Sequence, residues 1–108
     1  MTSPDKDRDQ LQRIARSVLN KEIGILDAAS ALLPLFRRLP ETVPEEDFKF
    51  VVAIESETDD LPLGRVRELW HPDALAEKDR EIRRCEELWG EQFRAVCERI
   101  LLRSQRSQ

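Results

Sequence analysis

Histidine and cysteine are scarce in this sequence, and their scarcity limits the chemistry that the chain can carry. His71 is the only histidine, and the two cysteines, Cys85 and Cys97, are 12 positions apart and form no C-x-x-C pair. A zinc site or a Ser-His-Asp triad therefore depends on His71 alone. That histidine precedes Pro72 and Asp73, which is typical of a ring that packs or caps at the start of a helix. We expect no catalytic residue, no cofactor and no metal ion.

Glycine-rich turns and long apolar runs are also missing. Gly24, Gly64 and Gly90 are isolated, so none of them opens the glycine-rich loop that cradles phosphates. The longest apolar stretch, residues 28–36, is broken by a serine and a proline, and it is far shorter than the roughly 20 residues of a membrane-spanning helix. The first residues lack the apolar segment of a secretory signal. We therefore expect a soluble cytoplasmic protein that enters no membrane and keeps its thiols reduced.

Positive charge is in short supply relative to negative charge. Lys plus Arg is 18 and Asp plus Glu is 22, which gives a net charge of −4. A surface of this sign has no general attraction for phosphate backbones, so we expect no nucleic acid partner. The negative charge is concentrated in residues 40–60, where eight carboxylates accompany a single lysine. This acidic segment favours a basic partner.

Regular apolar spacing is what the sequence does have. Residues 5–20 place apolar side chains three and four positions apart, which predicts an amphipathic helix. Residues 23–39 predict a second helix, which is the most buried element because apolar residues cover so much of it. Pro34 lies inside this stretch, and we expect it to kink the helix near residues 30–33 or to start a new one.

The segment after Pro44 is ambiguous between helix and strand. Phe48, Phe50, Val52 and Ile54 alternate as in a strand, and aromatic and β-branched residues favour that interpretation. The acidic residues directly after Pro44 are typical of the first turn of a helix. We predict a helix, because the chain offers no convincing second strand with which this one would pair.

The strongest periodicity in the chain runs from about residue 73 to residue 103. Leu75, Ile82, Trp89 and Val96 are spaced seven residues apart, which predicts a long helix with a narrow apolar seam. Such a helix is about 45 Å long, and part of it must project or kink, with Gly90 as its weak point. Cys85 and Cys97 lie about 18 Å apart on it, too far for a disulfide within one chain.

The length of this helix leads to a prediction about oligomeric state. A helix of about 45 Å is longer than a globule of this chain length. Another element must therefore cover its apolar seam. We predict a homodimer through the C-terminal helix, with Trp89, Phe93, Val96 and Ile100 packed against their mates. The alternative is that the first helix covers the seam within one chain.

Together, these segments predict an all-α fold. The 108 residues match the usual size of one domain with its own core. We expect a single domain, residues 1–108, built as a helical bundle of four or five helices with a long C-terminal helix. Residues 1–8 and 104–108 are expected to be flexible.

The most distinctive run is residues 55–60, which holds four carboxylates and two hydroxyls. Hard cations prefer such ligands, but an EF-hand is excluded because its sixth position requires glycine and here holds Asp60. The simpler interpretation is a solvated helix end, in which Glu57 and Asp59 pair with an arginine or cap the following turn. The cluster that we take as functional or structural consists of Glu55, Glu57, Thr58, Asp59, Arg65 and Arg67.

A set of short motifs occupies residues 48–82, about a third of the chain. They are Val52-Ala53-Ile54-Glu55-Ser56-Glu57-Thr58-Asp59, Leu61-Pro62-Leu63-Gly64, Val66-Arg67, Trp70, Leu75 and Lys78-Asp79-x-Glu81-Ile82. This stretch resembles small bacterial proteins of an uncharacterised domain family of unknown function. The resemblance implies a bacterial, cytoplasmic protein and no particular activity. It marks Glu57, Thr58, Asp59 and Arg67 for attention, and the family's histidine is replaced here by Asp60, which weakens a metal site.

Two functions fit these observations. The first is a non-enzymatic interaction or regulatory module, such as an adaptor, a regulator or an immunity protein, that meets a protein partner through residues 40–60. The alternative is a small enzyme or divalent-cation-binding protein centred on Glu55, Glu57, Asp59 and Asp60. Carboxylates that converge within about 4 to 6 Å in a concavity favour the second function, and carboxylates splayed into solvent favour the first.

Overall fold

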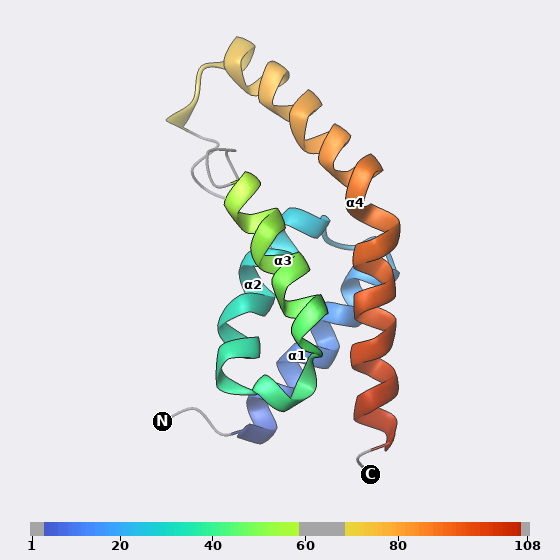
Figure 1. Ribbon diagram of the computed structural model, residues 1–108. Helices are drawn as coiled ribbons and strands as arrows, with labels where there is room; N and C mark the ends of the chain where they lie inside the picture. The colour runs from blue at the N-terminus through green and yellow to red at the C-terminus, as the bar shows by residue number, and fades with distance from the viewer. Residues whose placement is uncertain (1–3, 59–68, 107–108) are drawn as a thin grey trace.

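Four α-helices and one short 3₁₀ helix make up the part of the chain that the structure, a computed structural model, describes: residues 4–58 and 69–106. In chain order they are α1 (Pro4–Leu19), α2 (Ile25–Arg38), η1 (Pro40–Thr42), α3 (Glu45–Glu57) and α4 (Pro72–Arg106). Successive helices run in opposite directions, and α4 lies along the long axis of the molecule (Figure 1). The described ranges contain no strand. The prediction of a single all-α domain with a long C-terminal helix is confirmed.

The core forms around α2, which packs against α1, η1, α3 and α4. Its apolar positions are numerous enough to face neighbours on several sides, and eight of its 14 residues are buried. Burial of this apolar surface is the main source of stability, at roughly 25 cal/mol per Å². The largest fully buried side chains include Leu32, Leu33 and Phe36 from α2, and Phe93 and Ile100 from α4. The expectation that residues 23–39 hold the most buried helix is confirmed.

Pro34 does not divide this helix, contrary to the alternative that a new helix starts there. α2 continues through Pro34 to Arg38. Pro34 and Ser30 are both exposed, so water can donate to the Ser30 carbonyl that the missing proline N–H leaves without its helical partner. Exposure of this face explains why the helix tolerates a proline in its interior.

Residues 45–57 are helical, as predicted over the strand alternative. Pro44 is the N-cap of α3, and Glu45, Glu46 and Asp47 form its first turn, where carboxylates complement the positive end of the helix dipole. Val51 and Ile54 face the core. The alternating apolar residues that resemble a strand therefore divide between the buried side of a helix and its flanks.

The chain ends are helical beyond the predicted limits. α1 begins at Pro4, one residue before the expected start at residue 5, and α4 extends to Arg106, past the expected end near residue 103. Asp7 explains the first difference, because its buried carboxylate accepts hydrogen bonds from Arg38 Nε and Nη2 at 3.0 and 3.3 Å. The first turn of α1 is thereby attached to the last residue of α2.

α4 is the one element that is much longer than its neighbours. It contains 35 residues, which corresponds to about 52 Å, and the whole molecule measures 49 × 31 × 23 Å along its principal axes. Its N-terminal half passes beyond the other helices and leans over the end of α3 (Figure 1). The helix continues through Gly90 without interruption. None of the described helices is both long enough and apolar enough to cross a membrane.

Candidate functional site

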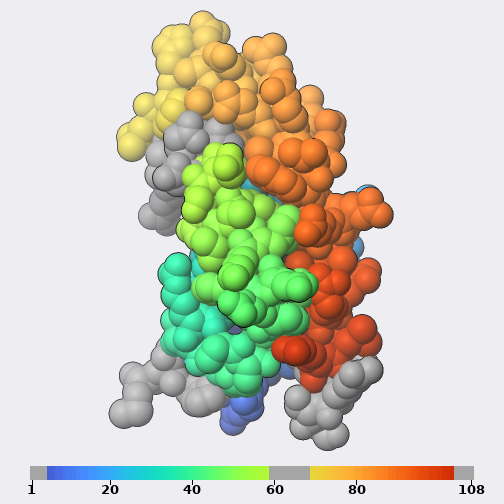
Figure 2. Space-filling view, in the orientation of Figure 1, coloured from blue at the N-terminus to red at the C-terminus, as the bar shows by residue number. Residues whose placement is uncertain are grey.

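The acidic segment, residues 40–60, covers η1 and α3. α3 forms much of the molecular face shown in Figure 2, and its outward residues Glu46, Lys49, Ala53 and Glu57 are exposed. These outward residues of α3 are therefore accessible to a partner, as the interaction hypothesis requires.

Half of the described carboxylates in this segment are occupied by ion pairs within the chain. Glu41 pairs with Arg8 at 3.3 Å and Glu45 pairs with Lys49 at 3.3 Å. These two pairs are exposed and contribute little to stability. The third carboxylate, Asp47, is held much more firmly and belongs to the core rather than to the surface.

Asp47 joins α3 to α4. Its side chain is only 12% exposed, and Arg99 Nε and Nη2 donate to its two carboxylate oxygens at 2.8 Å each. The hydrogen bond to this carboxylate is the main cause that raises the pKa of Arg99 above its ordinary value. A bidentate pair of this geometry fixes both side chains, so Asp47 serves structure and is not free to bind a partner.

The carboxylates that remain available are Glu46, Glu55 and Glu57. They form no ion pair with any other residue in the described ranges. Glu46 and Glu57 are exposed and Glu55 is half-buried. Because Glu46 and Glu57 lie near opposite ends of α3, they offer a line of negative charge rather than a converging group.

The predicted cluster at residues 55–67 is placed only in part. Thr58 is buried, and its hydroxyl donates to the Ile54 carbonyl at 2.7 Å, so it closes the last turn of α3. Asp59, Asp60, Arg65 and Arg67 lie outside the described residues. Within residues 4–58 and 69–106, no three histidine, cysteine, aspartate or glutamate side chains are placed to hold a metal ion.

An apolar hollow lies at the junction of α2, η1 and α3, beside the acidic segment. Its volume is about 280 Å³, and it is lined by Phe36, Arg37, Pro40, Val43, Glu45 and Phe48. The rings of Phe36 and Phe48 meet edge to face with their centroids 6.4 Å apart, which gives the hollow a firm wall. We call this feature the α2–α3 hollow.

The predicted dimer seam is filled within one chain. Phe93, Val96 and Ile100 are at most 2% exposed in the isolated chain, and α1 packs along α4. Trp89 is half-buried and packs against the same core. The seam assignment is therefore wrong, because the chain itself supplies the cover. The alternative, in which the first helix covers the seam, describes the structure.

The two cysteines differ in environment and neither is placed as a nucleophile. Cys97 is fully buried, and burial followed by the nearby Glu98 carboxylate raises its pKa to about 12. Cys85 is half-buried, and burial together with the Glu81 carboxylate also raises its pKa. A raised pKa disfavours the reactive thiolate at neutral pH. His71 is exposed, and its Nδ1 accepts a hydrogen bond from the Asp73 backbone N–H at 3.2 Å.

Comparison with protein-family models, with curated proteins and with solved structures finds no match to this chain. The resemblance of residues 48–82 to a bacterial domain family therefore remains a prediction.

Sequence reasoning missed the α2–α3 hollow and the Asp47–Arg99 pair. The hollow forms because Pro40 and Val43 turn the chain between two helices, and no spacing rule shows where such a turn leaves space. One feature of the sequence indicated a structural role for Asp47: a carboxylate in the first turn of a helix is stabilised by the helix dipole. Its partner 52 positions later was not identifiable from one sequence.

Proposed function

We propose that the protein is a non-enzymatic protein-interaction module whose contact surface combines the α2–α3 hollow with the acidic segment, residues 40–60. The observation that carries the proposal is the position of an apolar hollow beside exposed carboxylates. Pockets that accept one bulky apolar side chain are typical anchors of protein interfaces, and charge around them sets partner choice. The partner is therefore a basic segment that carries an apolar anchor residue.

Charge supports a basic rather than an acidic partner. Glu45 lines the hollow, and Glu41 and Glu46 flank it in sequence, whereas Arg37 is the only cation among the lining residues of this hollow. The ion pairs of Glu41 and Glu45 are exposed, so an incoming arginine can exchange with them at small cost. Negative charge here speeds the approach of a basic segment.

The test uses a defined peptide rather than an unknown partner. A short arginine-rich peptide with one leucine is titrated into the labelled protein, and amide shifts are followed by NMR. We expect saturable shifts at Phe36, Val43 and Phe48. A matched peptide with serine in place of leucine should bind about tenfold or more weakly, because it buries no large apolar side chain.

A charge-reversal pair supplies the control. Glu45→Lys should weaken binding of the leucine peptide about three- to tenfold, because it places a positive charge at the hollow. Glu87→Lys makes the same charge change on an exposed position of α4 and should leave affinity nearly unchanged. Equal losses for both variants, or shifts that avoid the hollow, contradict the proposal.

A further inference from the structure

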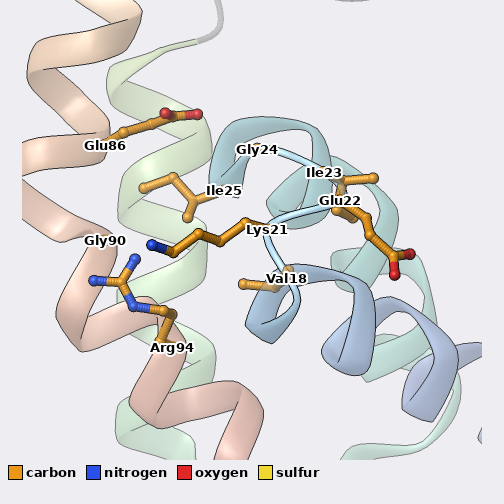
Figure 3. Close-up of a pocket in the computed structure, with 9 residues that line it drawn as sticks. All are labelled: Val18, Lys21, Glu22, Ile23, Gly24, Ile25, Glu86, Gly90 and Arg94. Atoms are coloured by element: carbon orange, nitrogen blue, oxygen red, sulfur yellow. The ribbon is translucent and has the colours of Figure 1, made fainter.

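A second cavity lies on another part of the molecule, where the turn between α1 and α2 faces the middle of α4. Its volume is about 330 Å³, within the range of small-molecule sites. Val18, Ile23 and Ile25 supply apolar wall, and the charged lining residues are Lys21, Glu22, Glu86 and Arg94. We call it the turn cavity, and Figure 3 shows it in close-up.

Lys21 occupies a backbone position that normally favours glycine. Its φ is 60°, and it is the only described non-glycine residue with a positive φ. The Glu22 N–H donates to the Ser17 carbonyl at 2.8 Å, and the Lys21 N–H donates to the Val18 carbonyl at 3.0 Å. These two bonds define a Schellman motif with Lys21 at the left-handed position, where a side chain other than glycine is strained.

Arg94 lies close to Gly90 on the cavity side of α4. A Cβ built on Gly90 would lie 3.3 Å from Arg94 Nη1, so the guanidinium lies back over the glycine one turn earlier in α4. Figure 3 shows the Arg94 guanidinium and the Lys21 ammonium pointing toward one another. The left-handed residue Lys21 and the Arg94 side chain beside Gly90 thus place two cations at one cavity.

The two cations are not neutralised by the chain. Neither Lys21 nor Arg94 forms an ion pair or side-chain hydrogen bond with another residue in the described ranges. Glu22 points away from the cavity (Figure 3). Glu86 lies on the Gly24 side, where its Oε1 is 2.6 Å from the position of a Cβ built on Gly24. The lining therefore holds two cations and two carboxylates, but only the two cations point toward one another (Figure 3).

We propose that the turn cavity binds a small ligand with one carboxylate and a short apolar body. The carboxylate accepts hydrogen bonds from both Lys21 and Arg94. Its two oxygens match the paired N–H donors of the Arg94 guanidinium. The apolar body contacts Val18, Ile23 and Ile25. A single negative charge is attracted by the two cations, and a doubly charged phosphate is repelled more strongly than a carboxylate by the nearby Glu86 carboxylate. This site shares no lining residue with the α2–α3 hollow and does not depend on the proposed function.

Hexanoate and hexylammonium are the matched probes, because they share one apolar chain and carry opposite charge. We expect hexanoate to give saturable amide shifts at Lys21, Ile25 and Arg94 with a Kd of about 1 to 10 mM. Hexylammonium should bind at least about fivefold more weakly. Inorganic phosphate, titrated at equal ionic strength, should bind more weakly than hexanoate. Equal affinity for both hexyl probes overturns the proposal, as does tighter binding of phosphate.

Substitution of Lys21 separates binding from folding. Lys21→Gly should raise the midpoint of thermal unfolding by about 2 to 4 °C, because glycine relieves the left-handed strain, and should weaken hexanoate binding about fivefold. Lys21→Asn removes the charge but keeps a residue that tolerates this conformation, and it should weaken binding by the same factor. A more stable protein with a weaker site cannot result from damage to the fold.

Arg94 has a matched control on the same helix. Arg94→Gln should weaken hexanoate binding about fivefold or more, because the bidentate donor is lost. Arg83→Gln removes the same charge from an exposed position of α4 and should change affinity by less than about twofold. If the Lys21 and Arg94 variants retain full affinity, or if Arg83→Gln loses as much, the assignment of the site is wrong.

Discussion

The two halves of α4 share one seven-residue apolar period but have different surroundings. In residues 90–101, Phe93, Val96, Cys97 and Ile100 are at most 2% exposed. In residues 72–89 no residue is fully buried, and Leu88 is 70% exposed. The end of α1 explains the difference, because Val18 and Gly90 line the same cavity and the rest of α4 extends past that point. Periodicity shows which side of a helix is apolar, and neighbouring elements decide how far it is buried.

The largest expected effect of this difference is on core packing. Phe93→Ala should lower the free energy of unfolding by about 3 to 5 kcal/mol, because it leaves a large cavity in a fully buried position. Ile82→Ala, in the half-buried part of the same helix, should cost about 1 kcal/mol. Urea unfolding of both variants measures the two losses. Similar losses would show that both halves belong to one equally packed core.

Removal of an ion pair from either half of α4 should have a smaller effect on the free energy of unfolding. Arg99→Ala should cost about 1 to 3 kcal/mol, because it leaves the largely buried Asp47 carboxylate without its two donors. The control is Glu81→Ala, which removes the pair with Lys78 at 3.5 Å in residues 72–89, where the Glu81 and Lys78 side chains are 43% and 25% exposed, and it should cost less than about 0.5 kcal/mol. Unfolding midpoints in urea check both values, and a loss below about 0.5 kcal/mol for Arg99→Ala contradicts the structural role of the pair.

A further effect appears only above pH 9, in the pH dependence of stability. The folded pKa of Cys97, about 12, lies above the ordinary value of 9.0, so the neutral thiol stabilises the folded state. This contribution is complete below pH 9 and is lost as the pH rises toward 12, by about 1.4 kcal/mol per pH unit. The difference in unfolding free energy between the native chain and Cys97→Ala should shrink correspondingly above pH 9.

Cys85 lies in residues 72–89 of α4, so its reactivity can be compared with that of Cys97 in residues 90–101. Its thiol is half-buried, so iodoacetamide should modify Cys85 in the folded protein while Cys97 reacts only after unfolding. Mass spectrometry of the modified chain distinguishes the two sites. Equal reaction of both thiols in the folded protein would mean that residues 90–101 open as readily as residues 72–89.

Much of the fold followed from the sequence because it depends on local spacing. The helices at residues 5–20 and 23–39 and the long C-terminal helix correspond to α1, α2 and α4, since apolar residues at helical spacing must face a core. Even the ambiguous residues 48–55 were assigned correctly, because a lone strand has no partner for its backbone. Element type and approximate limits were therefore predictable.

What the sequence left undetermined depends on contacts between distant residues. The burial of Asp7 required Arg38 at the far end of α2, and no spacing rule in the sequence indicates this pair. The cover over Phe93 and Ile100 required the path of α1, so the dimer seam was misassigned. Lys21 and Arg94 lie 73 positions apart in the sequence, and no motif connected them.

Native-state hydrogen exchange tests the contrast between the two halves of α4 most directly. Both halves have regular helical backbone, so differences in exchange report differences in packing rather than in hydrogen bonding. We predict that amides of residues 93–100 exchange only through global unfolding, and that amides of residues 75–82 exchange at least about a thousandfold faster after correction for intrinsic rates. Equal protection along the whole of α4 would contradict the account, because it would require both halves to be held by the same core.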